Sequence, residues 1–139
     1  MPTRCCSKCG QAALESSTFC KEMRPIPKDL NLDRLVGQQL QQICIGAHDL
    51  QFKFEGEDRI RCTGVVTVTI EEFCHDVFTE DGWKDASPLA KIAGRDVVSW
   101  KIESAYVFAI TLTPAAVIRF ISEDSPYEDF VVDPEVLVW

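Results

Sequence analysis

One pattern occurs twice in this chain, at a spacing of 57 residues. The segment 37–45 reads GQQLQQICI and the segment 94–102 reads GRDVVSWKI, with a glycine first and apolar residues at matching positions. The match then continues at a spacing of 58 residues: each apolar residue of the alternating pattern in 50–62 has an apolar counterpart in 108–120. Such self-similarity predicts two copies of one supersecondary unit, 37–73 and 94–132. We expect this repeat to be the scaffold, which leaves the segments outside it for function.

Each copy is predicted to form three antiparallel strands. Apolar and polar residues alternate in 50–54 and in 59–62, the pattern of half-buried strands. Three consecutive strands joined by short turns form a meander. The six expected strands cover 39–46, 49–55 and 59–64 in the first copy, and 96–103, 106–113 and 117–122 in the second.

The fold class is therefore mainly β, or α+β at most. Strand order does not follow from a sequence pattern, so two three-stranded antiparallel meanders could form a sandwich or a partly open barrel. The β-branched segment 65–73 either extends the third strand or forms a fourth. The segment 76–85 is acidic and expected to be irregular. A short helix is expected at about 87–93, with Ser87 as its N-cap, Pro88 at its first position and Gly94 after its last turn.

Composition is that of one ordinary globular domain. The chain has 139 residues, of which 46% are hydrophobic and 26% charged. No apolar run is long enough to span a membrane, and the N-terminus lacks the apolar core of a signal peptide. We expect a cytoplasmic protein with a cysteine-rich extension at 1–34 and a single β-rich domain at 35–139. Its oligomeric state does not follow from the sequence.

The net charge of −8 is concentrated toward the C-terminus. Residues 121–139 hold no basic residue and six acidic ones, namely Glu123, Asp124, Glu128, Asp129, Asp133 and Glu135. A surface of this sign repels nucleic-acid phosphates, so nucleic-acid binding is not expected. It can attract a basic protein partner, or it can simply keep the protein in solution.

The acid-rich stretch also contains two aromatic residues. In protein interfaces aromatic side chains anchor the contact and acids steer it, so this composition suits a contact surface. The alternative is a loop whose aromatic side chains fold back on the core. The candidate partner-binding residues are Glu123, Asp124, Tyr127, Glu128, Asp129 and Phe130.

The sharpest chemical signal is the motif Cys6-Ser-Lys-Cys9-Gly, which resembles the metal-binding knuckle of zinc ribbons and rubredoxins. Tetrahedral zinc needs four ligands, and Cys20 could supply a third and Cys5, His48 or His75 a fourth. There is no second Cys-x-x-Cys. The alternatives are an N-terminal extension with incidental cysteines, or a redox or inter-chain disulfide role. No cofactor is expected, unless these cysteines bind zinc.

The three cysteines within the predicted domain are interpreted as reduced packing residues, because free cysteine behaves as a small hydrophobe. They are Cys44, Cys62 and Cys74.

No catalytic arrangement is apparent, and we predict that the protein is not an enzyme. Cys74 and His75 are adjacent in an extended segment, so their side chains point to opposite faces and do not meet. Glycine-rich phosphate loops and Ser-His-Asp arrangements are missing from the sequence. The alternative is a small-molecule-binding or catalytic β-barrel, with a pocket lined by Trp100, Tyr106 and Phe108.

Four segments are similar to small bacterial domains of unknown function, several of which resemble immunity proteins of polymorphic toxin systems. The segments are LVG at 35–37, LQFKFEG at 50–56, IRC at 60–62 and SPYEDF at 125–130. The resemblance covers about residues 35–132. It implies a small, acidic, single-domain inhibitor of a basic toxin or nuclease domain, and it carries over no active residue. The function predicted from the sequence is thus a non-enzymatic protein-binding domain with an acidic contact surface.

Overall fold

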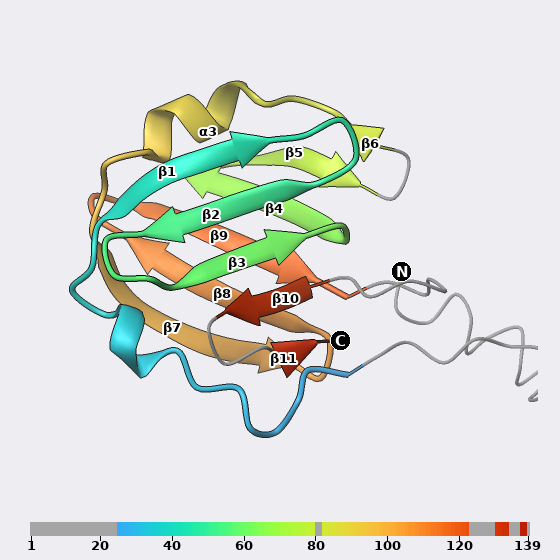
Figure 1. Ribbon diagram of the computed structural model, residues 1–139. Coiled ribbons are helices and arrows are strands. Elements are labelled where there is room, and N and C mark those ends of the chain that lie inside the picture. Colours follow the sequence, from blue (N-terminus) through green and yellow to red (C-terminus); the bar gives the residue numbers. More distant parts are fainter. Residues whose placement is uncertain (1–24, 80–81, 123–129, 134–136, 139) are drawn as a thin grey trace, which may run out of the picture.

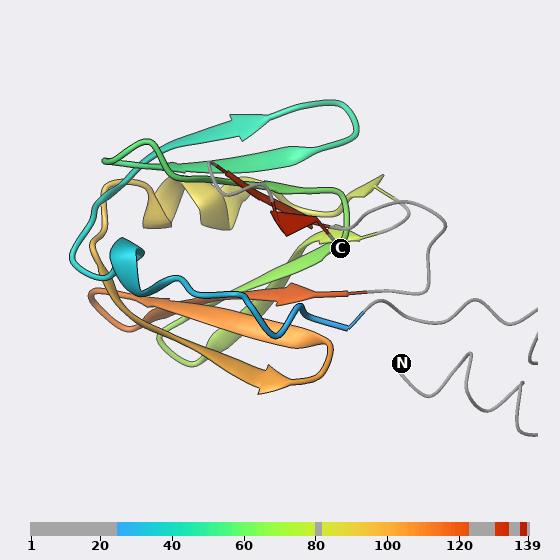
Figure 2. The ribbon, with the colours of Figure 1, turned by 60° about the horizontal axis from the view of Figure 1, so that its bottom comes forward.

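The computed structural model describes residues 25–79, 82–122, 130–133 and 137–138. Its strands form two antiparallel sheets that are not closed into a barrel (Figure 1). Figure 2 shows the sheets as two layers. The expectation of a mainly β fold is confirmed, and of the two architectures left open, the structure has the sandwich.

The two predicted meanders lie in different sheets. The first comprises β1 (Leu40–Ile45), β2 (Leu50–Phe54) and β3 (Arg59–Cys62). The second comprises β7 (Val97–Ser104), β8 (Val107–Leu112) and β9 (Ala116–Ile121). Within each meander, strands consecutive in the sequence are hydrogen-bonded neighbours. The apolar alternation of 50–54 places Leu50, Phe52 and Phe54 in the core, as its pattern predicts.

Segments outside the meanders complete both sheets. The five-stranded sheet has the order β1-β2-β3-β10-β11, with β10 (Phe130–Asp133) and β11 (Leu137–Val138). The six-stranded sheet has the order β6-β5-β4-β9-β8-β7, with β4 (Val65–Ile70), β5 (Phe73–Thr79) and β6 (Gly82–Trp83). The β-branched segment therefore forms a fourth strand, which leaves the sheet of β3 and pairs with β9 in the other layer.

The expectation of an irregular segment at 76–85 is wrong for its first part. Strand β5 continues to Thr79 and pairs with β6. The β4–β5 pairing has a register shift at Val77, which has no partner residue in β4. The side chains of the consecutive residues Val77 and Phe78 are both buried. The polar run before them conceals this strand in the sequence, whereas the pairing with β4 stabilises it.

The short helix α3 (Ser87–Ile92) forms as predicted, but Ser87 is not its N-cap. That position belongs to Ala86, and Ser87 is the first helical residue. The cap function comes from Asp85, whose Oδ1 accepts hydrogen bonds from the Ser87 backbone N–H at 2.9 Å and from its hydroxyl at 2.7 Å. These bonds, the backbone one first, lower the pKa of Asp85.

A short antiparallel contact joins the two meanders at their first residues. Its centre is a bridge between Gln39 and Asp96. The Gly37 N–H donates to Val97 O at 2.8 Å, and the Gly94 N–H donates to Leu40 O at 2.7 Å. Each of these bonds has a second one beside it, because the Val97 N–H donates to Gln38 O and the Leu40 N–H donates to Arg95 O, each at 2.8 Å. The four bonds therefore connect the two sheets in a reciprocal manner.

Four phenylalanines from both sheets fill the centre of the sandwich. The rings of Phe108 and Phe120 stack with centroids 4.4 Å apart, and Phe52 and Phe130 meet them edge to face. Each of the four is at most 1% exposed. Burying a side chain of this kind contributes about 1.5–3 kcal/mol, so this cluster is a major source of stability.

Candidate functional site

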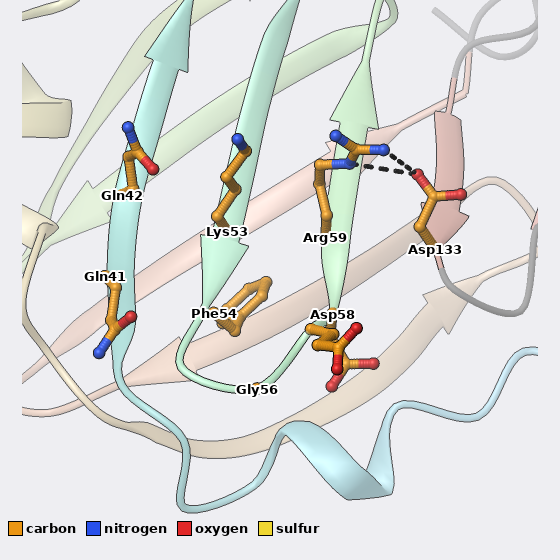
Figure 3. Close-up of a pocket in the computed structure, with 9 residues that line it drawn as sticks. Gln41, Gln42, Lys53, Phe54, Gly56, Asp58, Arg59 and Asp133 are labelled. Carbon is orange, nitrogen blue, oxygen red and sulfur yellow. Dashed lines mark hydrogen bonds and ion pairs between the residues drawn. The ribbon is translucent and has the colours of Figure 1, made fainter.

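The candidate site is a groove on the outer face of the five-stranded sheet. It has a volume of about 410 Å³ and crosses strands β1, β2, β3 and β10 (Figure 3). The turn between β2 and β3 closes one end of it. The lining residues are Gln41, Gln42, Lys53, Phe54, Gly56, Glu57, Asp58, Arg59 and Asp133.

Strand alternation explains why polar side chains face this groove. Successive side chains of a strand point to opposite faces, so the residues between the buried positions of β2 and β3 point outward. The pairing places Gln42 opposite Lys53, Lys53 opposite Arg59, and Arg59 opposite Asp133. Four polar side chains therefore form a row across four strands. Arg61 lies in the next row, opposite Gln51.

Two guanidinium groups share one carboxylate in this row. The Asp133 Oδ2 atom accepts hydrogen bonds from Arg59 Nε at 3.2 Å and from Arg59 Nη2 at 3.0 Å. Arg61 Nε lies 3.4 Å from the same oxygen, within ion-pair distance but without a hydrogen bond. Lys53 forms no ion pair with any residue that the structure describes.

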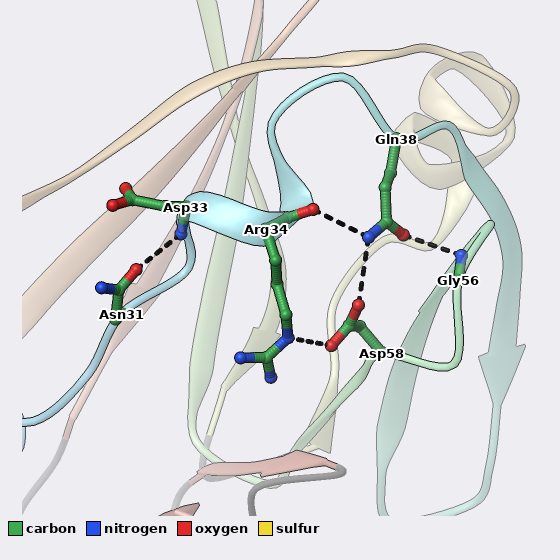
Figure 4. Close-up of polar contacts among 6 residues, drawn as sticks. All are labelled: Asn31, Asp33, Arg34, Gln38, Gly56 and Asp58. Carbon is green, nitrogen blue, oxygen red and sulfur yellow. Dashed lines mark hydrogen bonds and ion pairs between the residues drawn. The ribbon is translucent and has the colours of Figure 1, made fainter.

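A polar network fixes the turn that closes the groove (Figure 4). Asp58 Oδ1 pairs with Arg34 Nε, and Asp58 Oδ2 accepts a hydrogen bond from Gln38 Nε2 at 3.1 Å. The same Gln38 amide donates to Arg34 O at 2.8 Å, and its Oε1 accepts from the Gly56 N–H at 2.8 Å. The 3-10 helix η1 (Asp33–Leu35) is thereby attached to the β2–β3 turn. Asp58 is 8% exposed, so its two partners are needed to offset the cost of burying its charge.

The predicted contact surface is only partly within the described structure. Glu123, Asp124, Tyr127, Glu128 and Asp129 lie outside the described residues. Phe130 is described, and it lies in the aromatic core at 1% exposure. Its ring therefore belongs to the interior, as the alternative of a folded-back aromatic holds, and we leave it out of the contact surface.

Both ends of the acid-rich segment 123–129 are attached to the body of the sandwich. Ser122 is 0% exposed, and its N–H donates to Tyr106 O at 2.8 Å. Phe130 pairs with Cys62 in β3. Ile121, which precedes Ser122, pairs with Val65, the first residue of β4. Cys62, the partner of Phe130, is the last residue of β3, and only two residues separate it from Val65. Both attachment points therefore lie at the same end of the sandwich.

The predicted zinc ligands Cys6, Cys9 and Cys20 lie outside the described residues. Among residues 25–79, 82–122, 130–133 and 137–138, no group of three His, Cys, Asp or Glu residues could hold a metal ion.

The three cysteines of the domain differ in environment. Cys62 is buried, and its pKa is raised well above the ordinary value, first by burial and then by the charge of Asp49. Cys44 is half-buried, whereas Cys74 is exposed. All three are free thiols. The packing role expected for Cys74 is therefore wrong, because its side chain points outward from strand β5.

The residues of the barrel alternative do not surround an internal pocket. Phe108 fills the core, and Trp100 Nε1 donates a hydrogen bond to Asp33 Oδ1 at 2.7 Å. The sheets do not close, so the barrel interior that this alternative requires is not formed.

The cationic residues of the groove were missed in the sequence analysis, although the sequence contains a signal for them. The apolar residues of 50–54 and 60–62 define the inner face, so the lysine and arginines between them must share the outer face. The short turn at 55–58 then sets the register that places Lys53 opposite Arg59.

Comparisons with protein-family models, with curated proteins and with solved structures gave no match to this chain. The resemblance to immunity proteins stays a prediction. No helix among the described residues is long and apolar enough to cross a membrane.

Proposed function

We propose that the chain is a non-enzymatic, cytoplasmic protein-binding domain with the role of an immunity protein. Its acidic segment, residues 123–129, binds a basic partner such as a toxin or nuclease domain. The observation that carries the proposal is the attachment of the acid-rich segment 123–129 at both of its ends, by the buried residues Ser122 and Phe130.

Attachment at both ends favours binding. A segment with fixed ends has fewer conformations than a free tail, so it loses less entropy when it is ordered against a partner. The two anchors lie at the same end of the sandwich. The segment between them contains four of the six acids within seven consecutive residues, so it can present them to a partner as a group.

The sign of the charge favours a basic partner. Residues 121–139 contain six acids and no base. Such a field accelerates the encounter with a basic protein and disfavours an acidic one. A basic nuclease active site, built to bind phosphates, is one surface that this charge would fit.

Affinity capture from the native host tests the proposal. We expect the wild-type chain to retain a basic partner at low salt, and the triple variant Glu123→Lys, Glu128→Lys, Asp129→Lys to lose it. The matched control is Glu71→Lys, Glu72→Lys, Asp76→Lys, which changes the net charge equally at exposed positions on β5 and its turn. Capture of no partner at low salt, or equal retention by both triple variants, would contradict the proposal.

We also propose that the two meanders are copies of one ancestral unit. The reciprocal hydrogen bonds at Gly37 and Gly94 support this, because exchanging positions 57 residues apart converts each bond into another of the four. Sequences of relatives test it. Under duplication, some relatives should show higher identity between their two units, whereas unrelated meanders would show none.

A further inference from the structure

We propose that the groove on the outer face of the five-stranded sheet binds an acidic segment of a protein partner, whose carboxylates pair with Lys53 in the groove and with Arg61 in the neighbouring row. The groove is formed by β1, β2, β3 and β10 and does not include segment 123–129. The inference therefore goes beyond the proposed function and does not rest on it.

The first argument is the arrangement of charge. Lys53, Arg59 and Arg61 stand on two adjacent strands, and only the two arginines share Asp133. Of the other two carboxylates that line the groove, Asp58 pairs with Arg34, and Lys53 is left without an ion pair among the described residues. Lys53 lies directly opposite Arg59, and like charges in that position destabilise a sheet. The chain as a whole has 22 acidic and 14 basic residues, so cations are not in excess. Stability alone does not account for their placement here, whereas an anionic ligand does.

The second argument is the accessibility of Arg61. Its Nε atom is buried and makes no hydrogen bond, although it lies 3.4 Å from Asp133 Oδ2. The Arg61 side chain as a whole is 43% exposed, so a ligand can reach the guanidinium group by its exposed side. Lys53 and Arg61 are diagonal neighbours across β2 and β3, about 7–8 Å apart at the backbone, which long side chains can span. A carboxylate between them would accept hydrogen bonds from both.

The third argument is the shape of the groove and the polarity of its lining. The row from Gln42 to Asp133 crosses three strand spacings, about 14 Å, which an extended peptide covers in about four to five residues. The exposed carboxamides of Gln41 and Gln42 can donate to and accept from a peptide backbone. At the turn, Glu57 repels acids, so the carboxylates of the segment lie over Lys53 and Arg61 and its uncharged part lies over the turn.

Fluorescence anisotropy with a labelled hexaglutamate peptide tests this site. At an ionic strength of about 0.15 M, charges more than about 8 Å apart are largely screened, so the net charge of the chain contributes little and the groove contacts persist. We expect Lys53→Glu to weaken binding by about tenfold or more, because an attractive contact becomes repulsive. The matched control Lys91→Glu, at an exposed position on α3, changes the net charge equally and should leave binding unchanged.

A second variant should strengthen binding. Asp133→Asn removes the carboxylate that competes for Arg59 and Arg61, so we expect about threefold tighter binding of hexaglutamate. Loss of folding cannot mimic this gain. The proposal is overturned if hexaglutamate does not bind, if the variants at 53 and 91 have equal effects, or if Asp133→Asn weakens binding. It is also overturned if citrate displaces the peptide at equal concentration, because the site would then take a free carboxylate rather than a segment.

Discussion

Gly37 and Gly94 adopt the same left-handed backbone conformation on opposite sides of one antiparallel bridge. Their φ angles are +92° and +90°, and the N–H of each donates to a carbonyl of the other meander. No atom lies within 4 Å of the Cβ that alanine would add at either position. The requirement for glycine is therefore conformational and not steric.

Gly37→Ala and Gly94→Ala should each destabilise the fold. A residue with a Cβ costs about 1–2 kcal/mol in a left-handed conformation, and we expect a loss of that size in the free energy of unfolding measured in urea. Because both glycines hold the same junction, the loss in the double variant should differ from the sum of the two single losses. Unfolding free energies equal to the wild type would show that the junction tolerates a Cβ.

The opposite substitution at Glu71 should stabilise the protein. Glu71 has a φ of +59° in the β4–β5 hairpin, and its N–H donates to the carbonyl of Ala115, which has a φ of +51°. Glu71→Gly relieves strain of about 1–2 kcal/mol. The greater freedom of glycine in the unfolded chain costs about 0.4–1 kcal/mol, so we expect a net stabilisation of about 0.5 kcal/mol. The control is Glu72→Gly, because Glu72 does not have a positive φ, and this variant should be less stable than the wild type in thermal unfolding.

The Asp58 network should contribute more to stability than the exposed ion pair of Glu103 with Arg119. The side chain of Asp58 is 9% exposed, and Asp58→Ala removes the carboxylate that Arg34 Nε and Gln38 Nε2 contact. We expect a loss of about 2 kcal/mol. Glu103→Ala removes a pair whose side chains are 22% and 35% exposed, and it should cost less than about 1 kcal/mol. Equal losses in urea unfolding would contradict the assigned difference.

Cys62 should resist thiol reagents in the native state, and it should make stability fall at alkaline pH. Its pKa is raised in the folded state, so the folded chain holds the thiol proton at a pH where the unfolded chain releases it. The stabilisation is complete below the unfolded pKa and is lost as pH rises through the folded one. Cys62→Ala should therefore lose less stability than the wild type between about pH 8.5 and 10. In native labelling followed by peptide mass analysis, Cys74 should react before Cys44 and Cys62, because it is the exposed one of these three described cysteines.

Periodicity sufficed for the meanders but not for their assembly. The alternation of Leu50, Phe52 and Phe54 depends on local geometry, so the strand and its buried face could be predicted. The position of β4 beside β9 depends on contacts between residues about 50 apart, and no local pattern encodes it. Strand β5 was missed for the same reason, because its polar residues are held by pairing rather than by burial.

The groove could be predicted in part. The outward direction of Lys53 and Arg59 follows from the buried residues beside them. The ion pair of Arg59 with Asp133 required knowledge that β10 returns to pair with β3, and these two residues are 74 positions apart. The contact of Arg34 with Asp58 could not be predicted either, because the sequence assigns Arg34 to the N-terminal extension and Asp58 to the β-rich domain.

The anchors at Ser122 and Phe130 separate two properties that usually constrain each other. Strand β9 ends at Ile121 and strand β10 begins at Phe130, so the pairings of these two strands rest on residues outside the segment 123–129. Under the proposed function, the recognition residues can therefore change while these strand pairings are kept. Related chains that keep the phenylalanine core and diverge between the anchors would be retargeted copies of one scaffold.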